Sequence, residues 1–285
     1  MRAVLKTVCV LICFIMFIIA FGLCLYSYIS SLLYKIVKST FQQQCLHSCF
    51  TTERDILVQQ RNDISKLLNQ KQKVNGQMKC NYLRDTNTSA YQTTEEGGWC
   101  PIATKTKHLG FDRSLATTLA HFFKGKTVGS FGDGPGAYKM EILTTGLVKD
   151  YDAYDGAPFC EETSNGSVRF LDLSIPQYGL PVYDWILCLE VAEHIPEEFE
   201  AIMIDNIKRH AREGVILSWA IPGQGGYSHV NNRSPEYVIA EMEKIGFHYD
   251  SQETNNIRKG AKHRNLQRNI NVFLRTVVNN LSIDS

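Results

Sequence analysis

The sequence lacks any appreciable net charge, since its 285 residues include 30 Lys and Arg against 29 Asp and Glu. This excludes a protein whose overall field attracts nucleic acid or an anionic membrane surface, and no nucleic-acid partner is expected. Partners must be recognised by local sites instead. The composition is otherwise that of a globular protein, with 44% hydrophobic residues. The length allows one good-sized domain and an appendage.

Charged residues are absent from 8 to 33, where the chain reads V-C-V-L-I-C-F-I-M-F-I-I-A-F-G-L-C-L-Y-S-Y-I-S-S-L-L. This run exceeds the roughly 20 apolar residues that cross a bilayer. A secretory signal peptide has a shorter apolar core and a small-residue cleavage site, and this run has neither. We therefore predict that residues 1–38 form a short cytoplasmic tip and a single transmembrane anchor. The flanking Lys and Arg residues are nearly matched and leave the orientation open.

Sequons and cysteines favour a body in the secretory lumen. Four triplets fit the N-x-[ST] glycosylation pattern, at Asn87, Asn165, Asn232 and Asn280. The cysteines outside the predicted anchor are even in number, as disulfides in an oxidising compartment require: Cys45, Cys49, Cys80, Cys100, Cys160 and Cys188. Cys45 and Cys49 could form half of a metal site, but no nearby His or Cys pair completes it. Cys188 lies in an apolar run and is best explained as a small buried hydrophobe. We predict a single-pass type II protein of the ER or Golgi.

Residues 39–98 are predicted to form a partly helical stem and linker. Leu57, Ile64 and Leu68 lie at near-heptad spacing in a segment rich in Gln, Lys, Asp and Asn. Both a self-pairing helix, which would make a homo-oligomer through the stem, and a solvated spacer fit this pattern. Turn and polar residues from Asn75 to Gly98 indicate a linker. The main domain is therefore predicted to span residues 99–285.

Within that domain, predicted strands alternate with predicted helices. The strands are expected at 127–131, 148–154, 168–171, 183–189, 215–219, 247–250 and 270–277. The helices are expected at 112–123, 137–145, 197–212 and 235–245, the last with Ser234 as N-cap and Gly246 as its stop. This order predicts an α/β fold with a doubly wound, mostly parallel seven-stranded sheet that is covered on both faces.

A glycine-rich turn follows the first of these strands, where residues 127–136 read T-V-G-S-F-G-D-G-P-G. Gly132, Gly134 and Gly136 let backbone N–H groups approach a nucleotide-like ligand at the start of the next helix. A tight strand-to-helix corner would use the same residues. Acidic residues end the next three strands, namely Asp155, Asp172 and Glu190. In a doubly wound sheet these carboxyl ends form the ligand edge.

The ordered signals from 111 to 275 resemble the seven-β-strand, class I S-adenosylmethionine-dependent methyltransferase family. The resemblance implies a Rossmann-like fold, a glycine loop beside the methionine part of the cofactor, Asp155 on the ribose, and Asp172 with Leu173 beside the adenine. The segment Y-D-W-I-L-C-L-E-V-A-E-H-I-P, with Glu190, matches the family's methyl-transfer site. One position departs, because Ser130 stands where the family usually has an acid. Asp133 inside the loop is expected to replace it in part. A dinucleotide-binding site is the competing interpretation, because it would use the same glycine loop and Asp155, but it does not predict the segment from Glu190 to Pro196.

Glu190, Glu193 and His194 occupy one strand end and the turn after it, so their side chains are expected to converge. Carboxylates and imidazoles with open positions suit Mg²⁺ or Mn²⁺. Here the chain resembles small-RNA terminal 2′-O-methyltransferases and ubiquinone-pathway O-methyltransferases, which use E-x-x-E-H for metal. His229, in the loop G-Q-G-G-Y-S-H-V-N, is a candidate fourth ligand.

A metal-free site is the alternative. His194 or His229 would then be the general base, and Glu193 would order the loop. The catalytic candidates are therefore His194, His229 and Glu193. Trp219 and Tyr227 could line a sugar or ring site, although a Trp that ends a strand is also typical of core packing.

The expected function is O-methylation of a glycan hydroxyl by S-adenosylmethionine in the Golgi. The loop before His229 resembles bacterial methyltransferases associated with carbohydrate biosynthesis, and sugars offer vicinal diols to a metal. Two alternatives remain open. One is a membrane-bound O-methyltransferase that faces the cytosol and acts on a small molecule. The other is an inactive cofactor-binding interaction domain, which Ser130 favours.

Overall fold

The computed structural model describes residues 2–86, 93–100 and 111–276, without the side chains of residues 2–27, 37 and 41–51. Residues 1–60 and 61–285 form two units, which share the long helix α1 (Arg2–Asp85). Among the residues so described, no helix is apolar over enough of its length to cross a membrane. Most of the predicted anchor lies outside the described side chains, and two sequons, Asn87 and Asn280, lie outside the described residues.

The second unit is built on one seven-stranded sheet in the order β3-β2-β1-β4-β5-β7-β6. The strands are β1 (Thr127–Phe131), β2 (Asp150–Asp155), β3 (Val168–Phe170), β4 (Tyr183–Cys188), β5 (Ala211–Ser218), β6 (Phe247–Tyr249) and β7 (Ile270–Arg275). The first five run parallel, and β7 is antiparallel to both of its neighbours. The predicted α/β class and mostly parallel sheet are confirmed.

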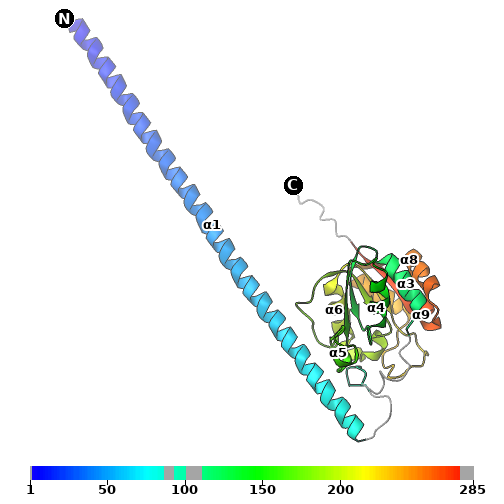
Figure 1. Cartoon of the computed structure of the whole chain (residues 1–285). Coiled ribbons are helices and arrows are strands. Elements are labelled where there is room, and N and C mark those ends of the chain that lie inside the picture. Colours follow the sequence, from blue (N-terminus) through cyan, green and yellow to red (C-terminus); the bar gives the residue numbers. More distant parts are fainter. Residues whose placement is uncertain (1, 87–92, 101–110, 277–285) are drawn as a thin grey trace. The chain divides into compact units, whose positions relative to one another are not determined.

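Helices cover both faces of this sheet (Figure 1). One core contains side chains of α3 (Arg113–Phe122), α4 (Ala137–Thr144), α5 (Cys160–Thr163), α8 (Ser251–Gly260) and α9 (Arg264–Asn269). The other contains those of α6 (Glu200–His210) and α7 (Pro235–Lys244). Cys188 is fully buried in the second core, as predicted. A sheet packed on both faces leaves its strand ends as the place for a ligand.

The local predictions for α7 hold, and others fail. The Ser234 side chain accepts from the N–H of Tyr237, and Gly246 has a φ of 91°, so the cap and stop of α7 are confirmed. The helix predicted at 197–212 is wrong at its end. It ends at His210, because Ala211 is already paired with Tyr183 in the sheet. Helices α8 and α9 were not predicted.

The last turns of α1 belong to the body, and the linker predicted from Asn75 is instead helical as far as Asp85. Three side chains of α1 donate to backbone carbonyls at 3.0–3.1 Å: Ser65 to Pro176, Asn69 to Phe170 and Gln77 to Pro158. A disulfide joins Cys80 to Cys100, which agrees with the even cysteine count. These bonds hold the helix against strand ends that the sequence placed in a separate domain.

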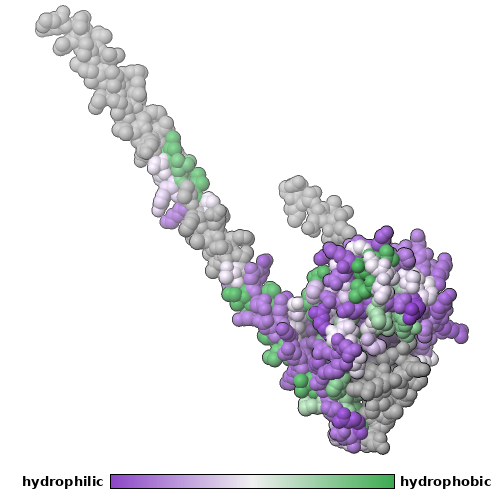
Figure 2. Space-filling model, viewed as in Figure 1, coloured by the Kyte–Doolittle hydropathy of each residue, from purple (hydrophilic) through white to green (hydrophobic). Residues whose placement is uncertain are grey.

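The same helix exposes apolar side chains, which give the green patches along its described part in Figure 2. Ile64, Leu67, Val74 and Met78 are each more than half exposed. They follow one another at three, seven and four residues, and so lie on one face. The residues that bond to the body lie on the other face.

Candidate active site

A cavity of about 550 Å³ opens at the carboxyl ends of β1, β2 and β4. Nine of the predicted site residues line it: Gly132, Asp133, Gly134, Asp155, Asp172, Leu173, Glu190, His194 and His229. Gly136 is instead the N-cap of α4, and Glu193 is buried with no exposed surface. One continuous cavity therefore joins the predicted cofactor end to the predicted catalytic end.

The glycine loop needs its glycines for different reasons. Gly132 has a φ of 92°, and a Cβ there would lie 2.1 Å from Cγ2 of Val191. Gly134 has a φ of 62°, but a Cβ there would meet no atom of the described residues within 4 Å. The first glycine is thus required by the fold itself. The second leaves open space on the cavity wall for a ligand.

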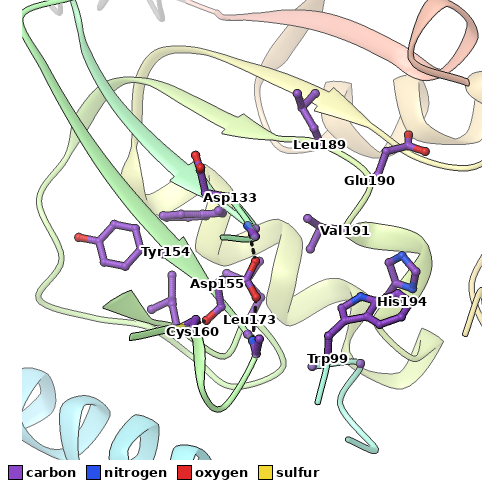
Figure 3. A pocket seen from close by; sticks show the side chains of 18 of the residues that line it. Trp99, Asp133, Tyr154, Asp155, Cys160, Leu173, Leu189, Glu190, Val191 and His194 are labelled. Carbon is purple, nitrogen blue, oxygen red and sulfur yellow. Dashed lines mark hydrogen bonds between the residues drawn. The ribbon is translucent and has the colours of Figure 1, made fainter. Parts of the chain in front are cut away.

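Asp155 shapes this loop from the end of β2. Its carboxylate accepts from the N–H of Gly134 at 2.7 Å and from the N–H of Ala157 at 2.8 Å (Figure 3). These two bonds draw the glycine loop and the turn after β2 together. The predicted contact of Asp155 with a ribose stays a prediction. What the structure shows is that the carboxylate of Asp155 holds the glycine loop in place.

Asp133 turns back from the loop toward Ser130, the position that lacks the expected acid. Its carboxyl accepts from the Tyr151 hydroxyl at 2.7 Å, and Ser130 is a second partner. Burial raises the pKa of Asp133 to about 6 against the opposing effect of these hydrogen bonds. A carboxyl group is thus supplied beside Ser130 from three residues further along the chain.

The raised pKa makes a prediction for Asp133→Asn. The folded state holds the Asp133 proton up to about pH 6, so the wild type loses stability as pH rises from about 4 to 6. The variant should therefore match the wild type below pH 4 and be more stable at pH 7, by up to about 3 kcal/mol. Urea unfolding of both proteins across this range measures the difference. If the difference in unfolding free energy between the two proteins does not change with pH, the raised pKa of Asp133 is wrong.

Asp172 is held from α1, which the sequence placed in the stem. Its carboxylate accepts from the N–H of Ser174 at 2.8 Å and from Nε2 of Gln72 at 3.1 Å. The backbone N–H of Asp172 donates to Asn69 Oδ1 at 3.0 Å. Gln72 and Gly76 of α1 also line the cavity. The predicted adenine end is therefore closed by helix residues that sequence reasoning did not include.

Glu193, His194 and His229 meet at the predicted catalytic end, with one possible ligand atom of each within 4.8 Å of the others. Val230 and Asn231 donate their N–H groups to the carbonyl of Glu193, which brings the loop of His229 against the turn of His194. The two imidazole rings lie 5.0 Å apart. Neither carboxylate oxygen of Glu193 has a well-formed hydrogen bond among the described residues, although the N–H groups of Glu193 itself and of Ala220 lie near enough to lower its pKa; Nδ1 of His229 has no partner there.

Glu190, the fourth predicted ligand, does not join this group. Its φ is 54°, and its carboxylate accepts from Ser218 Oγ at 2.8 Å and from Asn269 Nδ2 at 3.3 Å. These bonds turn it toward β5 and α9. The prediction that all four side chains converge is therefore wrong for Glu190, because Ser218 and Asn269 of two other elements hold its Oε1.

Burial sets the protonation of Glu193 and His194. Burial, and to a smaller extent the nearby charge of Glu190, raises the pKa of Glu193 to about 8. Burial, and to a smaller extent the neighbouring His229, lowers the pKa of His194 to about 4. His194 Nδ1 lies 3.2 Å from the carbonyl of Ser228, so this nitrogen carries the proton and donates it. The other ring nitrogen of His194 is left as an acceptor.

A buried carboxyl group beside two imidazoles is a donor set that suits a divalent cation. Burial of polar atoms without partners is costly, and a cation would satisfy both Glu193 and His229. The three residues therefore fit a metal site with open positions. Glu190 does not complete it.

The two aromatic residues considered from the sequence have different places. Trp219 is 2% exposed and donates to the carbonyl of Asn231 at 2.6 Å, so it is a core residue. Tyr227 is 54% exposed and lines the cavity, as predicted. Trp99, which the sequence marked only as the start of a domain, lies with its ring 5.6 Å from that of His194 (Figure 3).

No protein-family model matches the chain, and no curated protein matches it. Solved structures that are similar in fold include the magnesium protoporphyrin IX methyltransferase of Synechocystis PCC 6803 with bound SAH, at 16% identity over 57% of this chain and 83% of that one, with a TM-score of 0.43. The glycopeptide N-methyltransferase MtfA with sinefungin is similar at 12% over 59% and 95%, with a TM-score of 0.44. Likeness at this level supports no conclusion about activity or substrate.

Two groups of cavity residues escaped sequence reasoning. Gln72 and Gly76 lie in a polar helix whose role depends on how it packs. Thr94, Glu96 and Trp99 lie in a segment with turn composition. The cysteines that bracket most of these residues were a usable signal, since a disulfide between Cys80 and Cys100 fixes the segment between them.

Proposed function

We propose that the chain is an S-adenosylmethionine-dependent methyltransferase that acts on a hydroxyl group of a glycan. One observation carries the proposal: a single cavity joins the glycine loop, Asp155 and Asp172 to the Glu193, His194 and His229 trio. Gly132 and Gly134 would lie beside the methionine part, Asp155 at the ribose, and Asp172 with Leu173 at the adenine. S-adenosylmethionine supplies an activated methyl group there.

At the other end, the trio would orient the acceptor hydroxyl and handle its proton. A divalent cation held by Glu193, His194 and His229 would supply a Lewis acid that makes a hydroxyl easier to deprotonate. Without a cation, His194 would take the proton instead, because it is neutral at pH 7 with its pKa lowered to about 4 and its second ring nitrogen is an acceptor. The buried position of Glu193 keeps water away from its carboxyl group.

The acceptor and the compartment belong to the proposal. The Cys80–Cys100 disulfide supports an oxidising lumen, and with it the type II anchor and the ER or Golgi location. Asn165 is exposed and suits glycosylation. Asn232 does not, because its Nδ2 donates to the carbonyls of Ile221 and Gln224. Glycan mapping at Asn165 tests this point, since a cytosolic body would carry no glycan there.

Self-association through α1 is a further part of the proposal. The exposed apolar face of Ile64, Leu67, Val74 and Met78 supports it, because its spacing approaches the heptad of a two-helix seam. Light scattering of the full chain in detergent measures the mass of the particle. Charged substitutions at Leu67 and Val74 should make a dimer monomeric.

Calorimetry with S-adenosylhomocysteine and with NAD tests the cofactor. We expect micromolar binding of the first and none of the second. Gly134→Ala should weaken that binding by at least about tenfold, because its Cβ would point into open space that the ligand needs. Gly125→Ala is the matched control, since Gly125 has a φ of 72° and equally open surroundings but does not line the cavity. If both variants lose the same binding affinity, backbone strain explains the loss and Gly134 has no special role at the ligand.

A further inference from the structure

Residues 93–100 form a short hairpin, closed by a bridge between Thr93 and Trp99 and by the N–H of Thr94 donating to the carbonyl of Gly98 at 2.7 Å. Its last residue, Cys100, is tied by the disulfide to Cys80 of α1. The hairpin is thus fixed at its base to a long helix. It contributes Thr94, Glu96, Gly97, Gly98 and Trp99 to the wall of the cavity.

The hairpin touches both sides of the cavity. A Cβ on Gly97 would lie 2.3 Å from the carbonyl oxygen of His194, and a Cβ on Gly98 would lie 2.3 Å from that of Gly156. His194 follows β4 at the catalytic end, and Gly156 follows β2 at the predicted ribose end. Two adjacent glycines therefore let the hairpin backbone rest on both strand ends.

A third contact reaches the loop of His229. The hydroxyl of Thr93 lies 3.1 Å from that of Ser228, the residue before His229. The hairpin is thereby attached to each of the two segments that carry the imidazoles of the trio. Its position and the geometry of the trio are physically linked.

Trp99 is the side chain that this arrangement presents at the catalytic end. Its ring lies edge-on to His194 at 5.6 Å and 6.4 Å from the ring of Tyr227, and all three residues line the cavity. Two partly exposed aromatic rings thus lie next to a cluster of carboxyl and imidazole groups. Such a wall suits a ligand with one apolar face and a polar edge.

We propose that the 93–100 hairpin is the acceptor-positioning element of the site, with Trp99 and Tyr227 as the platform for one sugar ring. The apolar C–H face of a pyranose would lie on the aromatic rings, while its hydroxyl edge would face the trio. This inference rests on the proposed function and adds the residues that select a carbohydrate. Trp99 would contact the acceptor and not the cofactor.

The fluorescence of the full chain provides a direct readout. Of its three tryptophans, Trp185 and Trp219 are 5% and 2% exposed, so Trp99 is the one that a ligand can reach. We expect methyl glycosides of mannose, galactose or N-acetylglucosamine, added to the protein with S-adenosylhomocysteine, to change the emission. Trp99→Phe should lose that signal. A response to catechol but to none of the glycosides would overturn the sugar platform.

Kinetics separate acceptor binding from cofactor binding. Trp99→Ala should raise the KM for a saccharide acceptor by about tenfold, while Trp99→Phe restores most of it. The Kd for S-adenosylhomocysteine should stay within about twofold of the wild type in both. Equal losses of acceptor and cofactor affinity in Trp99→Ala, or no rescue by Phe, would overturn the proposal.

Gly97→Ala tests the hairpin without removing the ring. Its Cβ would push the hairpin away from His194, so it should raise the KM for the acceptor as Trp99→Ala does. Gly125→Ala again controls for strain at positive φ. An unchanged KM in Gly97→Ala would refute the positioning role. If the wild type binds glycosides through Trp99 but transfers no methyl group to any of them, the proposed function fails while the platform stands.

Discussion

Glu193→Gln is expected to abolish binding of a divalent cation and to lower methyl transfer by a factor of between about 10² and 10⁴. Glu193 is the carboxyl member of the trio, and a cation bound there would displace the proton that its raised pKa of about 8 otherwise retains at pH 7. An amide of the same shape removes the charge that a cation needs. Because Glu193 is protonated at pH 7 when no cation is bound, the neutral amide of the same shape should still fold and bind S-adenosylhomocysteine as the wild type does.

Manganese binding, followed by electron paramagnetic resonance, measures the first effect without a substrate. Glu190→Gln is the matched control, because that carboxylate is engaged by Ser218 and Asn269 and lies outside the trio. It should leave manganese binding intact. If wild-type protein binds no manganese and methylates in the presence of a chelator, the trio acts without a metal and His194 or His229 takes the proton.

Parts of the fold were predictable because their signals are local. The strand at 127–131, the glycine turn and the cap at Ser234 each depend on residues close in the sequence. The start of β5 was not, since Ala211 is in a strand only because β4 lies beside it. Helix α8 was missed for a similar reason. Its sequence S-Q-E-T-N-N-I-R-K-G buries only Thr254 and Ile257 and carries no clear apolar period.

The site residues likewise fall into those that local motifs predict and those that depend on contacts with distant elements. Motif spacing correctly placed the glycine loop, Asp155, Asp172 and the trio at one end of the sheet, because strand ends in a doubly wound sheet converge by topology. It failed for Glu190, whose direction is decided by Ser218 and Asn269 from distant elements. It also missed the contribution of α1. Hydrogen bonds between a polar helix and strand ends leave no periodic apolar trace in the sequence.

A chain that begins at Trp99 is expected to bind S-adenosylhomocysteine at least about 100-fold more weakly than one that begins at Arg61. Removal of residues 61–98 takes away Gln72, which donates to Asp172, and Gly76, which packs against Pro158. It also removes most of the 93–100 hairpin and one half of the disulfide. The cavity would then lack its wall at the adenine end.

Stability should fall as well, although the sheet keeps its two cores. The disulfide alone contributes about 3 kcal/mol for a loop of this length. The lost hydrogen bonds of Ser65, Asn69 and Gln77 contribute about 1 kcal/mol each. Calorimetric scanning and ligand titration of both fragments measure the two effects separately. Equal affinity in both fragments would show that α1 is only a spacer. A loss of affinity that Cys80→Ser with Cys100→Ser reproduces would instead attribute it to the disulfide, which holds the hairpin over the strand ends.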